Sequence, residues 1–160
     1  MADTAAGKLQ QILSQRQNHA REVTLEELAQ GLNRVIYLFH DELYLKLPDA
    51  GFIPRLAAWD DTDASVATVL QSWSYGVRLR VMVHRQLLPS LPLTALASMP
   101  LVLEDHRGVA VQLMARHCVT WSDLVTFHDC WLLVSQKALV TAMAQELCKK
   151  NNITLIRQES

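Results

Sequence analysis

The sequence contains few of the residues from which the common catalytic and nucleotide-binding motifs are built. Among its 160 residues are five glycines and three cysteines, and charged residues make up 19% of the chain. The patterns GxGxxG, GxxxxGKS/T, HExxH and CxxC do not occur. Loops that hold phosphates or nucleotides depend on such glycine spacings. No short motif therefore identifies the chain as an enzyme.

Three further absences narrow the class of protein. The net charge of −1 argues against a dedicated nucleic-acid binder, because such proteins are usually plainly basic. No uninterrupted apolar run approaches the ~20 residues that span a bilayer, and the first residues lack the basic-then-apolar order of a secretory signal. An odd number of cysteines does not build a disulfide framework in a chain of this length. We therefore expect a cytoplasmic protein without a membrane span.

Apolar residues, by contrast, are abundant. The chain is 50% hydrophobic, and its charged fraction lies below the roughly 25% that is typical of soluble domains. A single domain of this length buries roughly 70% of its unfolded surface. One core has difficulty hiding so many apolar side chains, so we expect some of them to be covered by another chain. A compact, apolar-rich monomer is the alternative.

The C-terminal third gives the clearest strand signals. Two apolar runs, Leu101–Leu103 and Val109–Leu113, flank a polar loop that ends in Gly108, which is the pattern of a hairpin. Two further apolar runs, Cys130–Val134 and Ile153–Ile156, predict two more strands. The residues between them recur at helical spacing, so a helix is expected there.

Upstream, the patterns are mainly helical. Thr24 and Glu27 have the spacing of a capping box, and apolar residues then recur every three or four positions, which predicts one helix over residues 25–45. The same segment resembles the opening of many helix-turn-helix domains. However, no turn and recognition helix follow within a few residues. We therefore favour a core helix over a DNA-binding one.

The middle of the chain contains an acidic cluster and one alternating segment. Asp60, Asp61 and Asp63 could ligate a hard cation, but Asp63 is more economically the N-cap of a second helix. Residues 77–84 then alternate between aliphatic and mostly polar side chains, which predicts a half-buried strand. The helix from residue 64 continuing through them is the alternative.

Together these patterns predict an α+β fold. We expect a mostly antiparallel sheet of about four strands, with two or three N-terminal helices and one C-terminal helix packed on it. Residues 23–160 are expected to form this single domain. Residues 1–22 carry only a narrow apolar stripe and are expected to form a loosely attached helix, or an arm that orders on a partner.

One group of residues has the chemistry of a metal or catalytic site. Cys118, His128 and Cys130 could contribute to a zinc site or supply a nucleophile and its base. On a strand, His128 and Cys130 would share a face, but two ligands do not make a site. We expect the thiols to pack as small apolar side chains and predict neither a metal nor a cofactor. An enzyme or metalloprotein that uses this cluster is the second alternative.

These inferences predict a non-catalytic protein-interaction module: a small adaptor, chaperone-like protein or assembly subunit that buries an apolar patch against another chain. The partner would be another protein, in a homo- or hetero-oligomer. A nucleic-acid-associated regulator that uses a basic sheet face is the first alternative. The candidate partner-binding residues form an N-terminal apolar stripe and the outer face of the strand over residues 77–84; they are Leu9, Ile12, Leu13, Arg78, Arg80 and His84.

Overall fold

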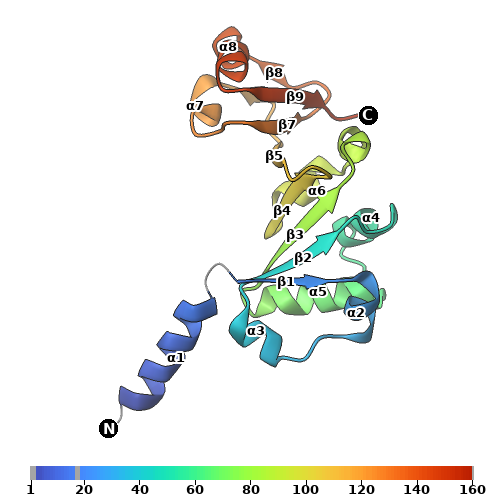
Figure 1. Ribbon diagram of the computed structural model, residues 1–160. Helices are drawn as coiled ribbons and strands as arrows, with labels where there is room; N and C mark the ends of the chain where they lie inside the picture. The colour runs from blue at the N-terminus through green and yellow to red at the C-terminus, as the bar shows by residue number, and fades with distance from the viewer. Residues whose placement is uncertain (1–2, 17–18, 160) are drawn as a thin grey trace.

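The computed structural model describes residues 3–16 and 19–159, which form two lobes joined through one sheet (Figure 1). The strands are β1 Ala20–Val23, β2 Glu42–Lys46, β3 Arg78–Val83, β4 Leu101–Asp105, β5 Ala110–Met114, β6 Cys118–Val119, β7 Cys130–Val134, β8 Leu139–Val140 and β9 Ile153–Arg157. The helices are α1 Asp3–Arg16, α2 Leu25–Gln30, α3 Val35–Phe39, α4 Phe52–Ala57, α5 Ala64–Ser74, the 3-10 helix η1 Arg85–Ser90, α6 Leu93–Ala97, α7 Trp121–Leu124 and α8 Ala142–Lys150.

The main sheet has seven strands in the order β1-β2-β3-β4-β5-β7-β9, which is also their order along the chain. Strands β1 to β4 are parallel to one another, as are β5, β7 and β9. The hairpin between β4 and β5 is the antiparallel pair that joins the two halves. A short parallel pair, β6 and β8, lies apart from this sheet.

The predicted mostly antiparallel sheet of about four strands is therefore wrong. The fold is α/β, with a mostly parallel, mixed sheet of seven strands. Parallel neighbours require a crossover connection, usually through a helix. Short helices lie between all the parallel neighbours: α2 and α3, α4 and α5, η1 and α6, α7, and α8.

The single helix predicted over residues 25–45 is also wrong. The Thr24 side chain caps α2 as expected, accepting a hydrogen bond from the Glu27 backbone N–H. This helix ends after one and a half turns, where Gly31 takes a φ of +89° that glycine adopts readily. The rest of the segment forms α3 and then β2. The apolar residues keep a helical spacing through these three elements although the helix itself is interrupted, and this is why the sequence predicted one helix.

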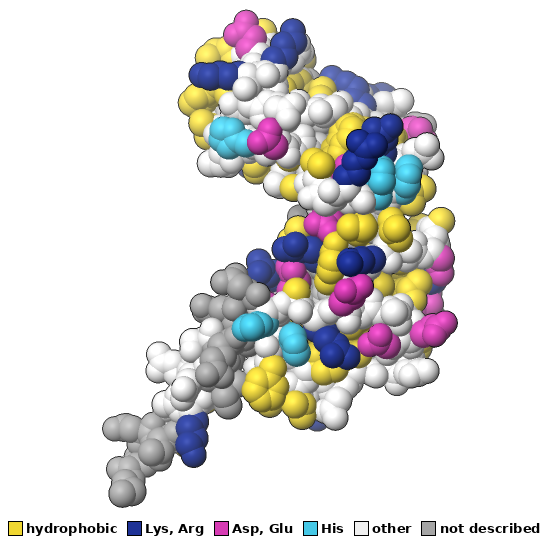
Figure 2. Space-filling view, in the orientation of Figure 1, with side chains coloured by type: hydrophobic (Ala, Val, Ile, Leu, Met, Phe, Trp, Pro, Cys, Tyr) yellow, Lys and Arg dark blue, Asp and Glu magenta, His cyan; other side chains and the backbone are white. Residues whose placement is uncertain are grey.

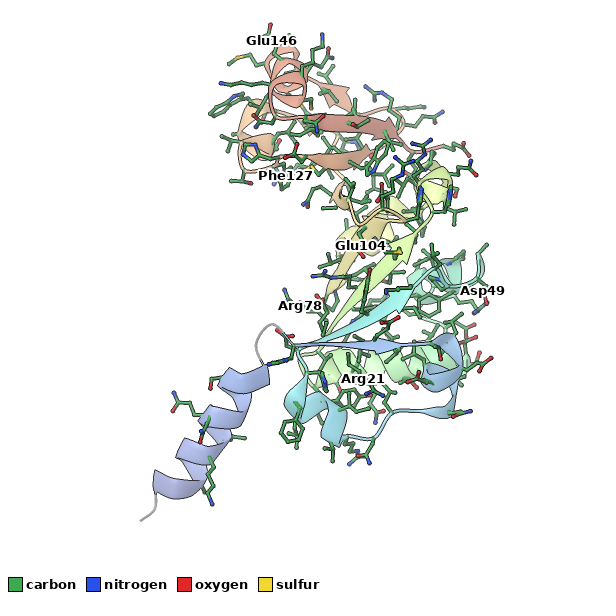
Figure 3. All side chains as sticks on the ribbon, viewed as in Figure 1. Arg21, Asp49, Arg78, Glu104, Phe127 and Glu146 are labelled. Carbon is green, nitrogen blue, oxygen red and sulfur yellow. The ribbon has the colours of Figure 1, made fainter. Side chains whose placement is uncertain are left out.

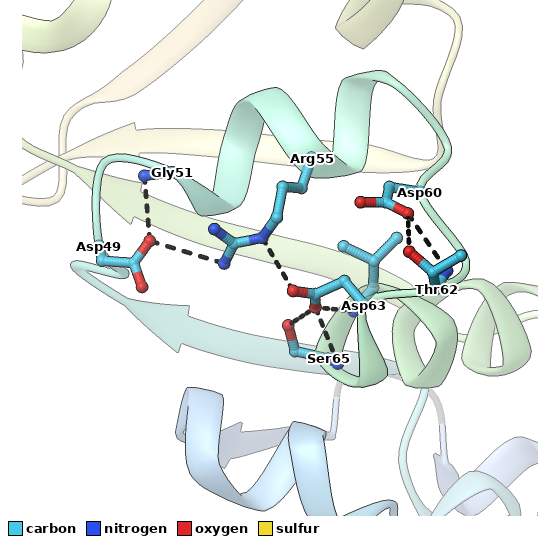
Figure 4. Close-up of polar contacts among 8 residues, drawn as sticks. Asp49, Gly51, Arg55, Asp60, Thr62, Asp63 and Ser65 are labelled. Carbon is cyan, nitrogen blue, oxygen red and sulfur yellow. Dashed lines mark hydrogen bonds and ion pairs between the residues drawn. The ribbon is translucent and has the colours of Figure 1, made fainter.

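Several local predictions are confirmed. The strand expected at residues 77–84 is β3, the predicted hairpin is β4–β5, and the last two predicted strands are β7 and β9. Asp63 caps α5 by accepting from the backbone N–H groups of Ser65 and Val66. Figure 4 shows this cap, with Arg55 bridging from α4 to the same carboxylate at 2.9 Å. Capping, rather than cation binding, is thus the use that the structure gives Asp63.

The two lobes bury opposite faces of the sheet. In the N-terminal lobe, residues 20–105, one face of β2, β3 and β4 packs against α2, α4 and α5. In the C-terminal lobe, residues 110–158, the other face of β7 packs against α8 through Leu132 and Val134. The face of β2–β4 that carries Tyr44, Arg80 and Glu104 therefore lies on the side away from its own lobe's helices. We call it the open face.

Among the described helices, none combines the length and the apolar character that crossing a bilayer requires.

Candidate interaction surfaces

The open face borders a hollow between the two lobes (Figure 2). At the centre of the open face is Arg80 of β3. Its Nε lies 2.9 Å from a carboxylate oxygen of Glu42 on β2. Its Nη1 lies 3.9 Å from Glu104 on β4, which also accepts a hydrogen bond from the Tyr44 hydroxyl. The Arg80 guanidinium lies over the Tyr44 ring, 5.8 Å from its centroid. One cation thus links three neighbouring strands.

Of the sequence-predicted residues, Arg78 and Arg80 lie together on β3, but their charges are neutralised locally. Arg78 lies 3.8 Å from the Asp41 carboxylate. Figure 3 shows Arg78 and Glu104 on neighbouring strands of the N-terminal lobe. A face whose arginines each have a carboxylate partner has little net attraction for a phosphate backbone.

His84 lies apart from the two arginines, just beyond the end of β3. Its ring stacks on His106, with the centroids 4.2 Å apart and the planes within 4° of parallel. Its Nδ1 accepts a hydrogen bond from the Gln86 backbone N–H and so caps η1. His84 is thus the N-cap of the 3-10 helix η1. The sequence analysis did not predict this structural role.

The predicted N-terminal stripe is described only in part. Residues 3–16 form α1, which contacts α3 and extends away from the sheet in Figure 1. Leu9 is 54% exposed. The side chains of Ile12 and Leu13 lie outside the described residues.

The cysteines and histidines considered for a metal or catalytic site have different environments. His128 and Cys118 are exposed, whereas Cys130 is buried at the start of β7. Burial raises the pKa of the Cys130 and Cys148 thiols above the ordinary value. Within the described part of the chain, no group of three or more His, Cys, Asp or Glu side chains has the geometry of a metal site.

Two surfaces that the sequence analysis missed are apolar. The first is a cavity of about 220 Å³ at the carboxyl ends of β2 and β3, between α4 and η1. Its position was not predictable, because β2 was read as part of a helix. Leucines and prolines are half of the residues that line it, and Ile53 and Val83 add to its apolar wall.

The second surface lies on the C-terminal lobe, where four large apolar side chains are more than 40% exposed. Helices α7 and α8 contact each other, and β8 leads directly into α8. In Figure 2, apolar side chains gather on the part of this lobe where α7 and α8 lie. We call this surface the C-terminal apolar patch; it comprises Trp121, Val125, Leu139 and Met143.

Comparison with known proteins gives a consistent result. A family model named PDU_like, with the description "Putative propanediol utilisation", matches residues 7–154. A bacterial microcompartment assembly protein, PduM of Salmonella typhimurium, is 32% identical over 124 residues, which cover 78% of this chain and 76% of that protein. PduM of Citrobacter freundii, described in the same words, is 25% identical over 147 residues, or 92% of this chain and 90% of that protein. No solved structure matches the chain.

Proposed function

Since the chain belongs to the PDU_like family, we propose that it is a non-catalytic assembly protein of a bacterial microcompartment. It would act by binding other protein components of that compartment, in the bacterial cytoplasm. Both relatives described above are microcompartment assembly proteins. This role agrees with the protein-interaction module expected from composition.

The observation that carries the proposal is the C-terminal apolar patch. Leu139 and Met143 are each 65% exposed, although their side chains are among the larger aliphatic ones. Scattered apolar residues are normal on a surface, but a group on adjoining elements favours a protein contact. Aromatic residues and methionine are enriched in such contacts, and the patch contains both Trp121 and Met143.

Within this role we favour an adaptor. The patch lies on the C-terminal lobe, whereas the cavity at the ends of β2 and β3 lies on the N-terminal lobe. Two apolar surfaces on different lobes allow one chain to hold two protein segments at once. A chaperone-like role would need only one such surface.

The test is deletion of the gene in a bacterium that forms the microcompartment, followed by electron microscopy of thin sections. We expect malformed or absent compartments, restored by the wild-type gene. Complementation with L139E or M143E should fail, because a carboxylate in a desolvated contact is costly. Both positions are exposed, so each variant should fold with stability within about 0.5 kcal/mol of wild type.

Gln136→Glu is the matched control. Gln136 is exposed and lies three residues before Leu139 in the sequence, and the substitution adds the same single negative charge. It should complement fully. Normal compartments in the deletion strain would refute the assembly role, and full complementation by L139E and M143E would remove the patch from it.

A further inference from the structure

The structure also points to the kind of partner segment that the N-terminal lobe binds. Resting on the proposed function, we infer that the carboxyl ends of β1, β2 and β3 form a docking groove for a partner peptide that places a bulky apolar side chain beside a lysine or arginine. We call this region the carboxyl-end groove. It consists of the 220 Å³ cavity and a second, shallower hollow of about 390 Å³ beside it.

The cavity supplies the apolar half of the groove. At about 220 Å³ it exceeds the ~150 Å³ that accommodates benzene in an engineered protein cavity, so an aliphatic or aromatic side chain fits. Its floor is Ile53 and Leu91, both nearly fully buried, and Leu87 at its rim is 38% exposed. In parallel α/β sheets, ligands generally bind beyond the carboxyl ends of the strands. This cavity lies at such a position.

Leu47 stands where the two hollows meet. It has a φ of +48°, a conformation that is unusual for a bulky residue, and its side chain is 55% exposed. Its backbone N–H donates to the Met82 carbonyl at 2.8 Å, which holds the strained residue at the end of β2. Strain maintained in this way is concentrated at functional sites. Here it turns a leucine side chain toward solvent at the mouth of an apolar cavity.

The second hollow supplies the acidic half. It shares Leu47, Pro48 and Asp49 with the cavity and adds Glu22 and Glu26. Its one lysine, Lys46, is already 3.6 Å from the Glu22 carboxylate. The Asp49 carboxylate lies 3.7 Å from Arg55 of α4, so three carboxylates face two cations and Glu26 supplies the excess negative charge. Figure 2 shows Asp and Glu side chains gathered on the right of the N-terminal lobe.

This charge decides what occupies the groove. A segment that fills the cavity with an apolar side chain must lie across the hollow that shares its wall. Acidic segments and nucleic acid would be repelled there, whereas lysine or arginine would be attracted. A basic side chain adjoining the apolar anchor therefore complements both parts.

A random dodecapeptide library displayed on phage, selected on the immobilised full-length protein, tests the inference. We expect the enriched peptides to pair a bulky apolar residue with lysine or arginine. A synthetic peptide of the enriched sequence should lose at least about tenfold in affinity for A50W, because Ala50 is exposed at the cavity and tryptophan would fill it. E26K should weaken binding by about threefold or more, since Glu26 belongs to the acidic hollow.

Matched substitutions elsewhere provide the controls. A58W changes another exposed alanine, in the turn after α4, that does not line the cavity, and E146K reverses an exposed charge on α8 in the other lobe (Figure 3). Both should bind the peptide like wild type. Failure to enrich any peptide, enrichment of acidic or purely polar peptides, or equal losses in A50W and A58W would overturn the inference. Those results concern isolated binding, so they would leave the assembly role, tested by gene deletion, standing.

Discussion

Tyr44 and Glu104 form a hydrogen bond across β3, although their strands β2 and β4 are not neighbours. Both side chains lie on the open face, and Arg80, on the intervening strand, lies beside both residues. Burial, and then the hydrogen bond to Glu104, raise the pKa of Tyr44 to about 12. Three strands of the open face are thus tied together by side chains as well as by their backbones.

This raised pKa predicts a loss of stability at alkaline pH. The neutral phenol is favoured in the folded state, so its stabilisation is fully present below the ordinary pKa of 10.0 and is lost as the pH rises toward about 12. Y44F should cost about 1 kcal/mol at pH 7 through the lost hydrogen bond. It should also flatten the decline in unfolding free energy between those pH values, measured by urea denaturation. An unchanged alkaline decline in Y44F would contradict the assignment.

A second prediction concerns the ion pairs of Arg80. The Glu42 side chain is only 7% exposed, so removing Arg80 would leave a buried carboxylate without its cation. R80M should destabilise the fold by about 2 kcal/mol, less than the 3–5 kcal/mol of a fully buried pair because Arg80 itself is 42% exposed.

R78M is the control for this prediction. Arg78 is 55% exposed and its partner atom is 3.8 Å away, so its loss should cost less than about 0.5 kcal/mol. The double variant R80M/E42Q should recover part of the loss, because the uncompensated charge is gone. Equal effects of R78M and R80M on the urea midpoint would show that burial of Glu42 does not matter.

The sequence predicted elements better than it predicted their arrangement. The hairpin signal around Gly108 located β4–β5 correctly, and the alternation at residues 77–84 located β3. Nothing comparable marks the direction in which distant strands pair. Helices α2, α3, α4, α6 and α7 have four to six residues, which is too short for a helical period to be distinguished from chance. The crossovers built only from such short helices were therefore invisible. The longer helices α5 and α8 were predicted, but the strands on either side of them were not recognised as parallel neighbours.

The candidate surfaces were less predictable than the elements for the same reason. The carboxyl-end groove exists only because β1, β2 and β3 end side by side, and β2 was read as helix. The C-terminal apolar patch consists of residues such as Leu139, which looks like a core leucine in a linear sequence but is 65% exposed. Composition alone indicated that apolar surface would remain uncovered, without indicating where.

A third prediction uses the different environments of the three thiols. Cys118 is exposed, whereas Cys130 and Cys148 are buried with raised pKa values. Because the thiolate is the reactive form, a disulfide reagent such as DTNB should modify one thiol rapidly in the native protein and the other two only on unfolding. C118S should abolish the rapid phase. Rapid reaction of two thiols in native C118S would show that the C-terminal core opens readily.

The last prediction concerns Asp105, which stands where the lobes are joined. Asp105 is the last residue of β4. Its side chain accepts hydrogen bonds from the backbone N–H groups of Arg107 and Val109 at 2.8 Å and from the Trp131 indole N–H of β7 at 2.9 Å. One carboxylate thus fixes the hairpin turn and links it to the C-terminal lobe. Burial tends to raise its pKa, but the bonds from Trp131, Val109 and Arg107 outweigh that effect, so the pKa lies below the ordinary 3.8.

A depressed pKa means that the stabilisation is present above the unfolded-state pKa and is lost as the pH falls through the folded-state value. D105N should therefore cost about 2–3 kcal/mol at pH 7, since one amide oxygen cannot replace two charged acceptors, and should weaken the acid dependence of the unfolding free energy. D129N is the control, because Asp129 is exposed and its carboxylate accepts a hydrogen bond from the Asn152 side-chain amide, with no link to the hairpin turn. Its cost should stay below about 0.5 kcal/mol. If D105N unfolded with the same midpoint and acid dependence as D129N, the junction between the lobes would have to be held by the β4–β5 backbone pairs and the apolar contacts around Leu103 and Val111 instead.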